Sequence, residues 1–291
     1  MKKKFHILIL SAGLVVVAMA LSVNLGLIAS GDPEGSSDAS KVDASLAERL
    51  SANDNHIPFI MMFNRSSMPG DELLDSEGLH VEHRYHIIPG ASAVGSAQDI
   101  RRLADRQWID SIFLDGSVHV AGPARVDSDF SGESPAEMVN ASSLWSQGIN
   151  GTGVTVAILD SGIDPNHPDL EGSVIGEVNF IEDEETTGDL LGHGTMCAGI
   201  IAGSGEASGG KYRGIAPGAK LLNVRVIDSN GDGKDSDIIA GIEWALNNGA
   251  DVISMSLGGL DLGQTDLPVT TAADNAMDAG AVVCVAAGNS G

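Results

Sequence analysis

Short, nearly continuous apolar runs are the dominant pattern in the second half of the chain. They lie at 154–159, 220–227, 251–257 and 281–287. Runs of this length, bounded by glycines and polar residues, are typical of strands buried on both faces of a parallel sheet. Between and after them, residues 236–248 and 270–279 have the spacing of amphipathic helices. The alternation predicts an α/β fold with a doubly wound parallel sheet.

The preceding part of the chain has a different rhythm. Strand-like runs lie at 57–63, 79–88, 91–94, 112–114 and 118–120, with a helical pattern over 96–108. We predict a small α+β domain over residues 55–122 and assign residues 123–291 to the α/β domain. Residues 31–54 begin with a Gly/Ser-rich polar stretch and are predicted to be a linker, with a short amphipathic helix at 42–50.

The first thirty residues have the composition of an export signal. Three lysines follow Met1, and an apolar stretch runs from about Ile7 to Ala29. This stretch is also long enough to be an uncleaved anchor, although we favour cleavage. The rest of the chain is expected outside the cytoplasm, secreted or on the cell surface, with membrane contact only through such an anchor. The net charge of -24 argues against nucleic acid as a partner.

Polar side chains stand where three of the core segments begin or end. Asp160 and Asn289 follow apolar strands, and His193 is flanked by glycines at the start of a small-residue helix. Aspartate, histidine and asparagine together suit acyl transfer, as orienter, general base and oxyanion donor. Two other interpretations remain: Asp160 could simply cap a turn, or Asp160 and His193 could bind the metal of a hydrolase. The second would need a third ligand with suitable spacing, and the sequence shows none.

These residues lie in motifs that resemble the subtilisin-like serine proteases. Four motifs occur in that family's order between about Leu144 and Gly291: Asp160-Ser161-Gly162-Ile163, His193-Gly194-Thr195, Ser256-Leu257-Gly258-Gly259 and Ala287-Gly288-Asn289. The resemblance implies a serine-type endopeptidase with Asp160, His193 and Asn289 in its catalytic site. It also implies that Ser256, Leu257 and Gly258 bind an extended protein or peptide substrate, and that the chemistry needs no cofactor.

One family motif has no counterpart in these residues. The nucleophilic serine is expected in a Gly-Thr-Ser-Met-Ala-like turn after Asn289, and the sequence ends at Gly291. We therefore expect a C-terminally incomplete catalytic domain that is inactive alone. The resemblance makes the 55–122 domain the propeptide, a partner of its own protease, released by a cut between Val120 and Pro135. The alternative is an inactive truncated homologue whose propeptide-like part acts as an inhibitor or folding module.

Structural calcium is the one metal that the sequence leaves open. By resemblance, Asp169 matches a calcium position, although the loop 204–212 does not look like the family's version. Asp228, Asn230 and Asp232 form the first half of an EF-hand-like pattern, but position twelve is Ile239 instead of Glu. An acidic turn is the simpler interpretation.

The remaining metal-ligand and thiol side chains are assigned structural roles. His80, His83 and His86 are expected to be solvated strand histidines, because their spacing does not place them on one face. Cys197 and Cys284 are expected to be free thiols.

Overall fold

The computed structural model describes residues 39–52, 54–120, 134–259 and 267–288, all within one compact unit, Ser37–Gly291. Within these ranges, no helix is long and apolar enough to cross a bilayer. The predicted leader lies outside them.

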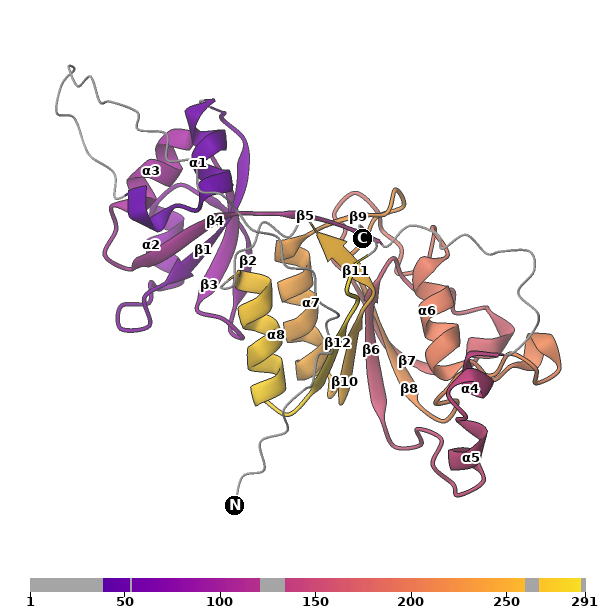
Figure 1. Cartoon of the computed structure of the whole chain (residues 1–291). Helices are drawn as coiled ribbons and strands as arrows, with labels where there is room; N and C mark the ends of the chain where they lie inside the picture. The colour runs from indigo at the N-terminus through magenta and orange to yellow at the C-terminus, as the bar shows by residue number, and fades with distance from the viewer. Residues whose placement is uncertain (1–38, 53, 121–133, 260–266, 289–291) are drawn as a thin grey trace, which may run out of the picture. The chain divides into compact units, whose positions relative to one another are not determined.

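A five-stranded parallel sheet forms the framework of the second half (Figure 1). Its order is β12-β10-β6-β8-β7, and every neighbouring pair is parallel. The strands are β6 (Thr155–Asp160), β7 (Val174–Asn179), β8 (Lys220–Arg225), β10 (Val252–Met255) and β12 (Val282–Val285). The helices of this part are α4 (Pro135–Met138), α5 (Ser142–Trp145), α6 (His193–Ala202), α7 (Asp235–Asn247) and α8 (Pro268–Asp278), with short 3-10 turns η2 (Pro168–Leu170) and η3 (Glu206–Ser208). The predicted α/β fold is confirmed.

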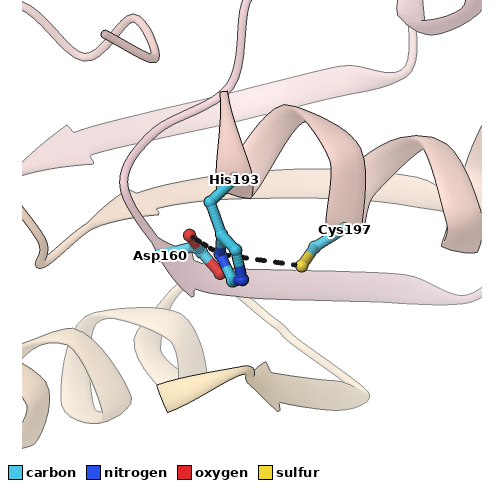
Figure 2. A group of neighbouring side chains, drawn as sticks. All are labelled: Asp160, His193 and Cys197. Carbon is cyan, nitrogen blue, oxygen red and sulfur yellow. Dashed lines mark hydrogen bonds and ion pairs between the residues drawn. The ribbon is translucent and has the colours of Figure 1, made fainter. Parts of the chain in front are cut away.

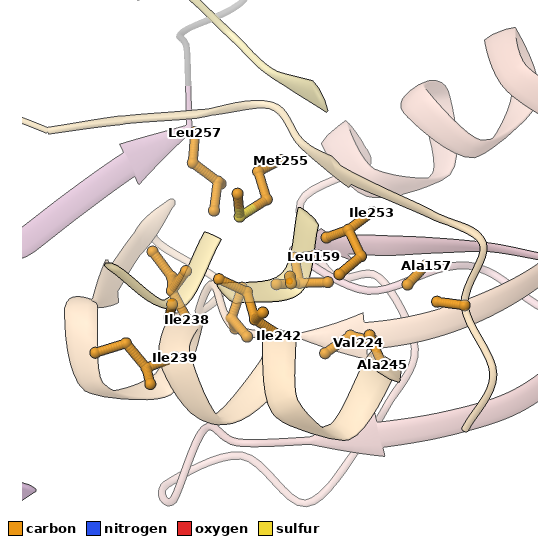
Figure 3. Close-up of a cluster of buried hydrophobic side chains, with 14 of the residues drawn as sticks. Ala157, Leu159, Val224, Ile238, Ile239, Ile242, Ala245, Ile253, Met255 and Leu257 are labelled. Atoms are coloured by element: carbon orange, nitrogen blue, oxygen red, sulfur yellow. The ribbon is translucent and has the colours of Figure 1, made fainter. Parts of the chain in front are cut away.

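Alternating side chains of β6 anchor a separate core on each face of the sheet. Ala157 and Leu159 belong to the cluster that α7 and α8 cover (Figure 3). Val156 and Ile158 belong to the cluster on the other face, where α6 contributes Cys197, Ala198 and Ala202. A strand with apolar residues on both sides reads as a continuous apolar run, which is why the sequence shows no alternation here.

The first part of the chain is a separate layer with its own antiparallel sheet and core. Its strands, in the order β2-β3-β1-β4, are β1 (Ile57–Phe63), β2 (His80–Tyr85), β3 (Gly90–Gly95) and β4 (Ile109–Leu114). Its helices are α1 (Ala44–Ser51), α2 (Asp71–Ser76) and α3 (Ala97–Ala104), and a 3-10 turn, η1 (Ala39–Lys41), precedes them. Leu46 and Leu50 of α1 are buried in this core. The predicted linker therefore contains a packed helix, and the folded layer begins before residue 55.

A third sheet joins the two parts through backbone hydrogen bonds. Strand β5 (Ser117–Val120), which directly follows the first layer, lies between β9 (Asp232–Lys234) and β11 (Leu257–Gly259), antiparallel to both. The β-branched residues of β5 explain why this segment is extended.

Packing beneath the sheet predicts a large cost for truncating Ile242. Ile242 of α7 is fully buried, whereas Ile175 of β7 is 57% exposed. Ile242→Ala is expected to lower the free energy of unfolding by about 2–5 kcal/mol, since it leaves a cavity in the core. The matched change Ile175→Ala is expected to stay within about 0.5 kcal/mol of the parent. Urea unfolding of both variants followed by circular dichroism measures the difference, and equal losses would contradict this packing.

Candidate active site

Asp160 and His193 meet at the carboxyl edge of the parallel sheet (Figure 2). Asp160 is the last residue of β6, and His193 is the first residue of α6. The His193 Nδ1 atom lies 2.7 Å from Asp160 Oδ1, an oxygen that also accepts the backbone N–H of Ser161 at 2.7 Å. The Asp160 side chain is 1% exposed and that of His193 is 12% exposed. The predicted pairing of base and orienter is thus present as a close contact.

The electrostatics of this pair favour a proton acceptor at His193. The hydrogen bond to Asp160 raises the pKa of His193 above its ordinary value; burial opposes this, and the charges of Asp160 and Asp189 add to it. When Nδ1–H donates to the carboxylate, the Nε2 lone pair is left to take a proton. A carboxylate in this position fixes the tautomer of the base and stabilises its protonated form.

Cys197 lies one turn after His193 on α6. Its Sγ atom is 3.9 Å from His193 Nδ1 (Figure 2). Across the described ranges, Asp160, His193 and Cys197 are the one trio of acidic, histidine or cysteine side chains whose donor atoms lie within 4.8 Å of one another. Burial raises the pKa of the Cys197 thiol to about 11, so without a metal the thiol is protonated at neutral pH. Cys197 and Cys284 are both free, as expected.

The third predicted catalytic residue, Asn289, lies outside the described residues. Gly288 comes directly before it and lies near β11: a Cβ atom added to Gly258 would be 3.8 Å from Gly288 Cα. Gly288, the last described residue before Asn289, therefore lies close to the segment predicted to bind substrate.

The segment predicted to bind substrate pairs with an extended strand of the same chain. Leu257 and Gly258 belong to β11, and Ser256 directly precedes it. Val120 stands opposite Leu257, and His119 stands opposite Gly258. Backbone-to-backbone pairing of this kind is how an extended peptide adds to a sheet edge.

The carboxylates considered for calcium accept hydrogen bonds from other parts of the chain or from their own turn. Asp169 Oδ1 accepts the Ala207 N–H at 2.7 Å. Asp228 Oδ1 accepts the N–H groups of Asn230 and Asp232 at 2.8 and 2.9 Å, as in an acidic turn. Asp232 Oδ1 in turn lies 2.5 Å from His119 Nδ1 of β5. Calcium binding at these residues stays a prediction.

Two of the three histidines expected to be solvated, His83 of β2 and His86 after it, contact helix α7. His83 Nε2 lies 3.0 Å from Asp237 Oδ1, and its side chain is only 25% exposed. His86 Nδ1 lies 3.0 Å from Glu243 Oε1, although its side chain is 85% exposed. The expectation was wrong for His83, whose partner lies 154 residues further along the chain, whereas His86 is exposed as expected.

Two groups that sequence reasoning missed support this region. Asp115, between β4 and β5, is buried and accepts hydrogen bonds from the Ser236 backbone N–H and hydroxyl at 2.9 and 2.7 Å. Burial raises its pKa to about 7, although these bonds oppose the shift. Arg225 ends β8, is fully buried, and donates to the Thr186 carbonyl at 2.7 Å and to Glu184. A lone arginine at the end of an apolar strand was the available signal.

The contact between Asp160 and His193 at the sheet edge is the arrangement expected of the orienter and base of a serine peptidase, and known proteins were compared with the chain. Residues 151–291 match the model of the subtilase family. The chain is 34% identical to subtilisin J of Geobacillus stearothermophilus over 292 residues, covering 99% of this chain and 68% of that protein. It is 47% identical to the serine protease AprX of Bacillus subtilis (strain 168) over 156 residues, covering 50% of this chain and 35% of that protein.

A solved structure shares the same architecture. Fervidolysin from Fervidobacterium pennivorans, described as a keratinolytic enzyme related to subtilisin, superposes with a TM-score of 0.62 at 26% identity. The match covers 81% of this chain and 40% of that one. The chain thus belongs to the subtilase family of serine endopeptidases. It spans between about a third and two thirds of the length of these relatives.

The contact between Asp160 and His193 predicts a specific dependence on pH. In the parent chain, the imidazole of His193 is expected to titrate above 6.5, its ordinary value. Because the folded form binds this proton more tightly, the stabilisation is complete below pH 6.5 and is lost as the pH rises through the raised pKa. In Asp160→Asn the imidazole should titrate below the parent midpoint, and this loss of stability with pH should disappear. NMR titration of histidine-labelled protein and urea unfolding between pH 5 and pH 9, about the range in which histidine titrates, measure both effects. The exposed Asp278→Asn is the control, and an unshifted midpoint in Asp160→Asn would contradict the pairing.

Proposed function

We propose that the chain belongs to the precursor of a secreted serine endopeptidase that hydrolyses peptide bonds of proteins or peptides. The observation that carries this proposal is the 2.7 Å contact between the buried Asp160 carboxylate and His193 at the carboxyl edge of the sheet. His193 takes the proton of the attacking serine hydroxyl, and Asp160 holds the ring in the tautomer that allows this. The same histidine then gives the proton to the leaving amine.

Two further groups complete the proposed chemistry. Asn289 donates its side-chain amide to the oxyanion of the tetrahedral intermediate. None of the serines in residues 1–291 lies in a Gly-Thr-Ser-Met-Ala-like turn, so the nucleophile is not among these residues. We expect the 291-residue chain by itself to be without peptidase activity.

The first layer and β5 act as the propeptide in this proposal. Strand β5 lies along β11 as an extended substrate would. Helix α7 holds the layer through Glu243, whose Oε2 accepts the N–H groups of His86 and Ile87 at 2.6 and 2.8 Å. Helix α8 adds a bond from Asn275 Nδ2 to the Ile87 carbonyl at 2.7 Å. The layer therefore supports the helices beside the sheet and fills the position of the substrate.

The expected location and metal content complete the proposal. The leader at residues 1–30 supports export, with the protein secreted or held at the cell surface. No cofactor is needed for acyl transfer by this pair. The proposal includes a structural calcium ion at Asp169 or at the 228–232 turn.

Peptidase activity is tested with the complete product of the gene that encodes this chain. It is expected to cleave an unstructured protein such as casein, and a serine-directed phosphonate should abolish cleavage. His193→Ala is expected to lower kcat at least about a thousand-fold, because the general base is lost. Asn289→Ala should lower kcat about a hundred- to thousand-fold with little change in KM, the loss known for the corresponding donor of a subtilisin.

The same experiment separates the alternative function. A catalytically inactive homologue acting as an inhibitor or folding module would show no phosphonate-sensitive cleavage in the parent protein and no difference between the parent and His193→Ala. That result would overturn the proposal.

The contacts of Glu243 predict how tightly the first layer is held. In Glu243→Gln, an amide NH₂ replaces one acceptor, so the two backbone N–H groups that it serves lose a charge-assisted partner. Hydrogen exchange at His86 and Ile87 in the full chain is expected to accelerate about ten-fold or more. Glu171→Gln, at an exposed glutamate outside this interface, is the control. Equal protection in parent and Glu243→Gln would show that Glu243 does not hold the layer.

A further inference from the structure

We propose that Asp189 is a positioning residue for the Asp160–His193 pair. Its carboxylate joins the turn that follows Asp160 to the beginning of the helix that carries His193. This inference rests on the proposed function, because it concerns the base of that reaction.

Five donors converge on the Asp189 carboxylate. Oδ1 accepts the Ser161 hydroxyl at 2.9 Å, the Leu191 N–H at 3.0 Å and the Gly192 N–H at 2.7 Å. Oδ2 accepts the Thr195 N–H at 2.8 Å and the Thr195 hydroxyl at 2.6 Å. Both oxygens of the carboxylate are thus bonded to groups close in sequence to Asp160 or His193.

These donors come from both segments that the pair requires. Ser161 directly follows Asp160, whereas Gly192 and Thr195 surround His193. Ser161 Oγ also accepts the Gly194 N–H at 3.0 Å. These contacts form a closed circuit. Ser161, which follows Asp160 in the chain, donates to Asp189, and Asp189 also accepts the N–H of Gly192. Gly192 directly precedes His193, and His193 contacts Asp160. A shift of either segment would stretch at least one of these bonds.

Close backbone contact reinforces the circuit. A Cβ atom added to Gly194 would lie 2.1 Å from the Gly162 carbonyl oxygen, so only glycine fits at the second residue of α6. The start of the helix is therefore pressed against the turn after Asp160. Small displacements of this kind are costly for catalysis, since proton transfer requires a well-aligned pair.

An ordinary helix cap would not account for these contacts. The N-cap of α6 is Gly192, which has no capping side chain, and the first turn of α6 contains no acidic residue. Asp189 supplies the missing acceptor from three residues earlier, but it also binds Ser161, which is not part of the helix. The loop before Asp189 is fixed in turn by Arg225, which holds Thr186 and Glu184.

The charge of Asp189 acts on the same base. Burial opposes its ionisation, but hydrogen bonds from Thr195, Gly192 and Ser161 outweigh this and hold the pKa of the Asp189 carboxyl below its ordinary value. The charged and titratable groups that act on His193 are Asp160, Asp189 and the neutral Cys197. Asp189 therefore contributes both geometry and negative potential to the imidazole.

The test is the titration of His193 in Asp189→Asn. The Asn NH₂ would face the Thr195 donors, and the negative charge would be lost. By NMR of the histidine-labelled chain, the His193 midpoint is expected to fall by about half a pH unit, and the downfield Nδ1 proton resonance should weaken. Asp251→Asn is the matched control, since Asp251 accepts the Thr155 N–H at 2.9 Å at the opposite end of β6.

A second variant separates positioning from stability. Ser161→Ala removes the link to the turn but keeps the Asp189 charge and its bonds to α6, and it should shift the midpoint in the same direction by a smaller amount. If both variants lower the free energy of unfolding while the His193 titration stays that of the parent, Asp189 is a structural cap only and the proposal is overturned. If Asp189→Asn does not fold, the Ser161→Ala result decides alone. Neither measurement needs hydrolysis, so absence of phosphonate-sensitive activity in the complete gene product would count against the proposed function and leave this test intact.

Discussion

One buried carboxylate, that of Asp160, fixes the geometry at the edge of the parallel sheet. A carboxylate with 1% exposure loses its hydration, and hydrogen-bond donors of the protein offset part of this loss. Asp160 Oδ1 receives two such donors, from Ser161 and His193. The parallel sheet brings Asp160 to the edge where β6 ends, and α6 begins there with the histidine. The hydrogen bonds of this one oxygen atom therefore involve both the turn after β6 and the histidine proposed as the base.

Around the Asp160 carboxylate, hydrogen bonds connect segments that are distant in sequence. Asp189 and Arg225 hold the loop before α6, and Asp115 and Glu243 hold the first layer against α7. All four are ionisable groups that bind backbone N–H or carbonyl groups, and Asp189, Arg225 and Glu243 do so as charged groups. Because such bonds are stronger than neutral ones and directional, they define positions that apolar packing alone would leave loose.

The sequence predicted those features that depend on local pattern. The apolar run at 154–159 became β6, the helical spacing at 236–248 became α7, and the motifs brought Asp160 and His193 together. Strand β7 was missed because it is only half buried, with Ile175 exposed. The contacts of His83 and Asp115 could not be predicted, since they join residues 154 and 121 positions apart. Local propensity contains no information about such pairs.

The position of β5 affects how an external peptide would compete for pairing with β11. While β5 is part of the same chain as β9 and β11, its pairing with them is intramolecular, and its effective concentration beside these strands is of about millimolar order. An external peptide must exceed that value to displace it. The proposed cut between Val120 and Pro135 would make the same pairing bimolecular, so that it would weaken on dilution. Inhibition of the proposed protease by its first layer and β5 would then depend on their concentration as well as on their contacts.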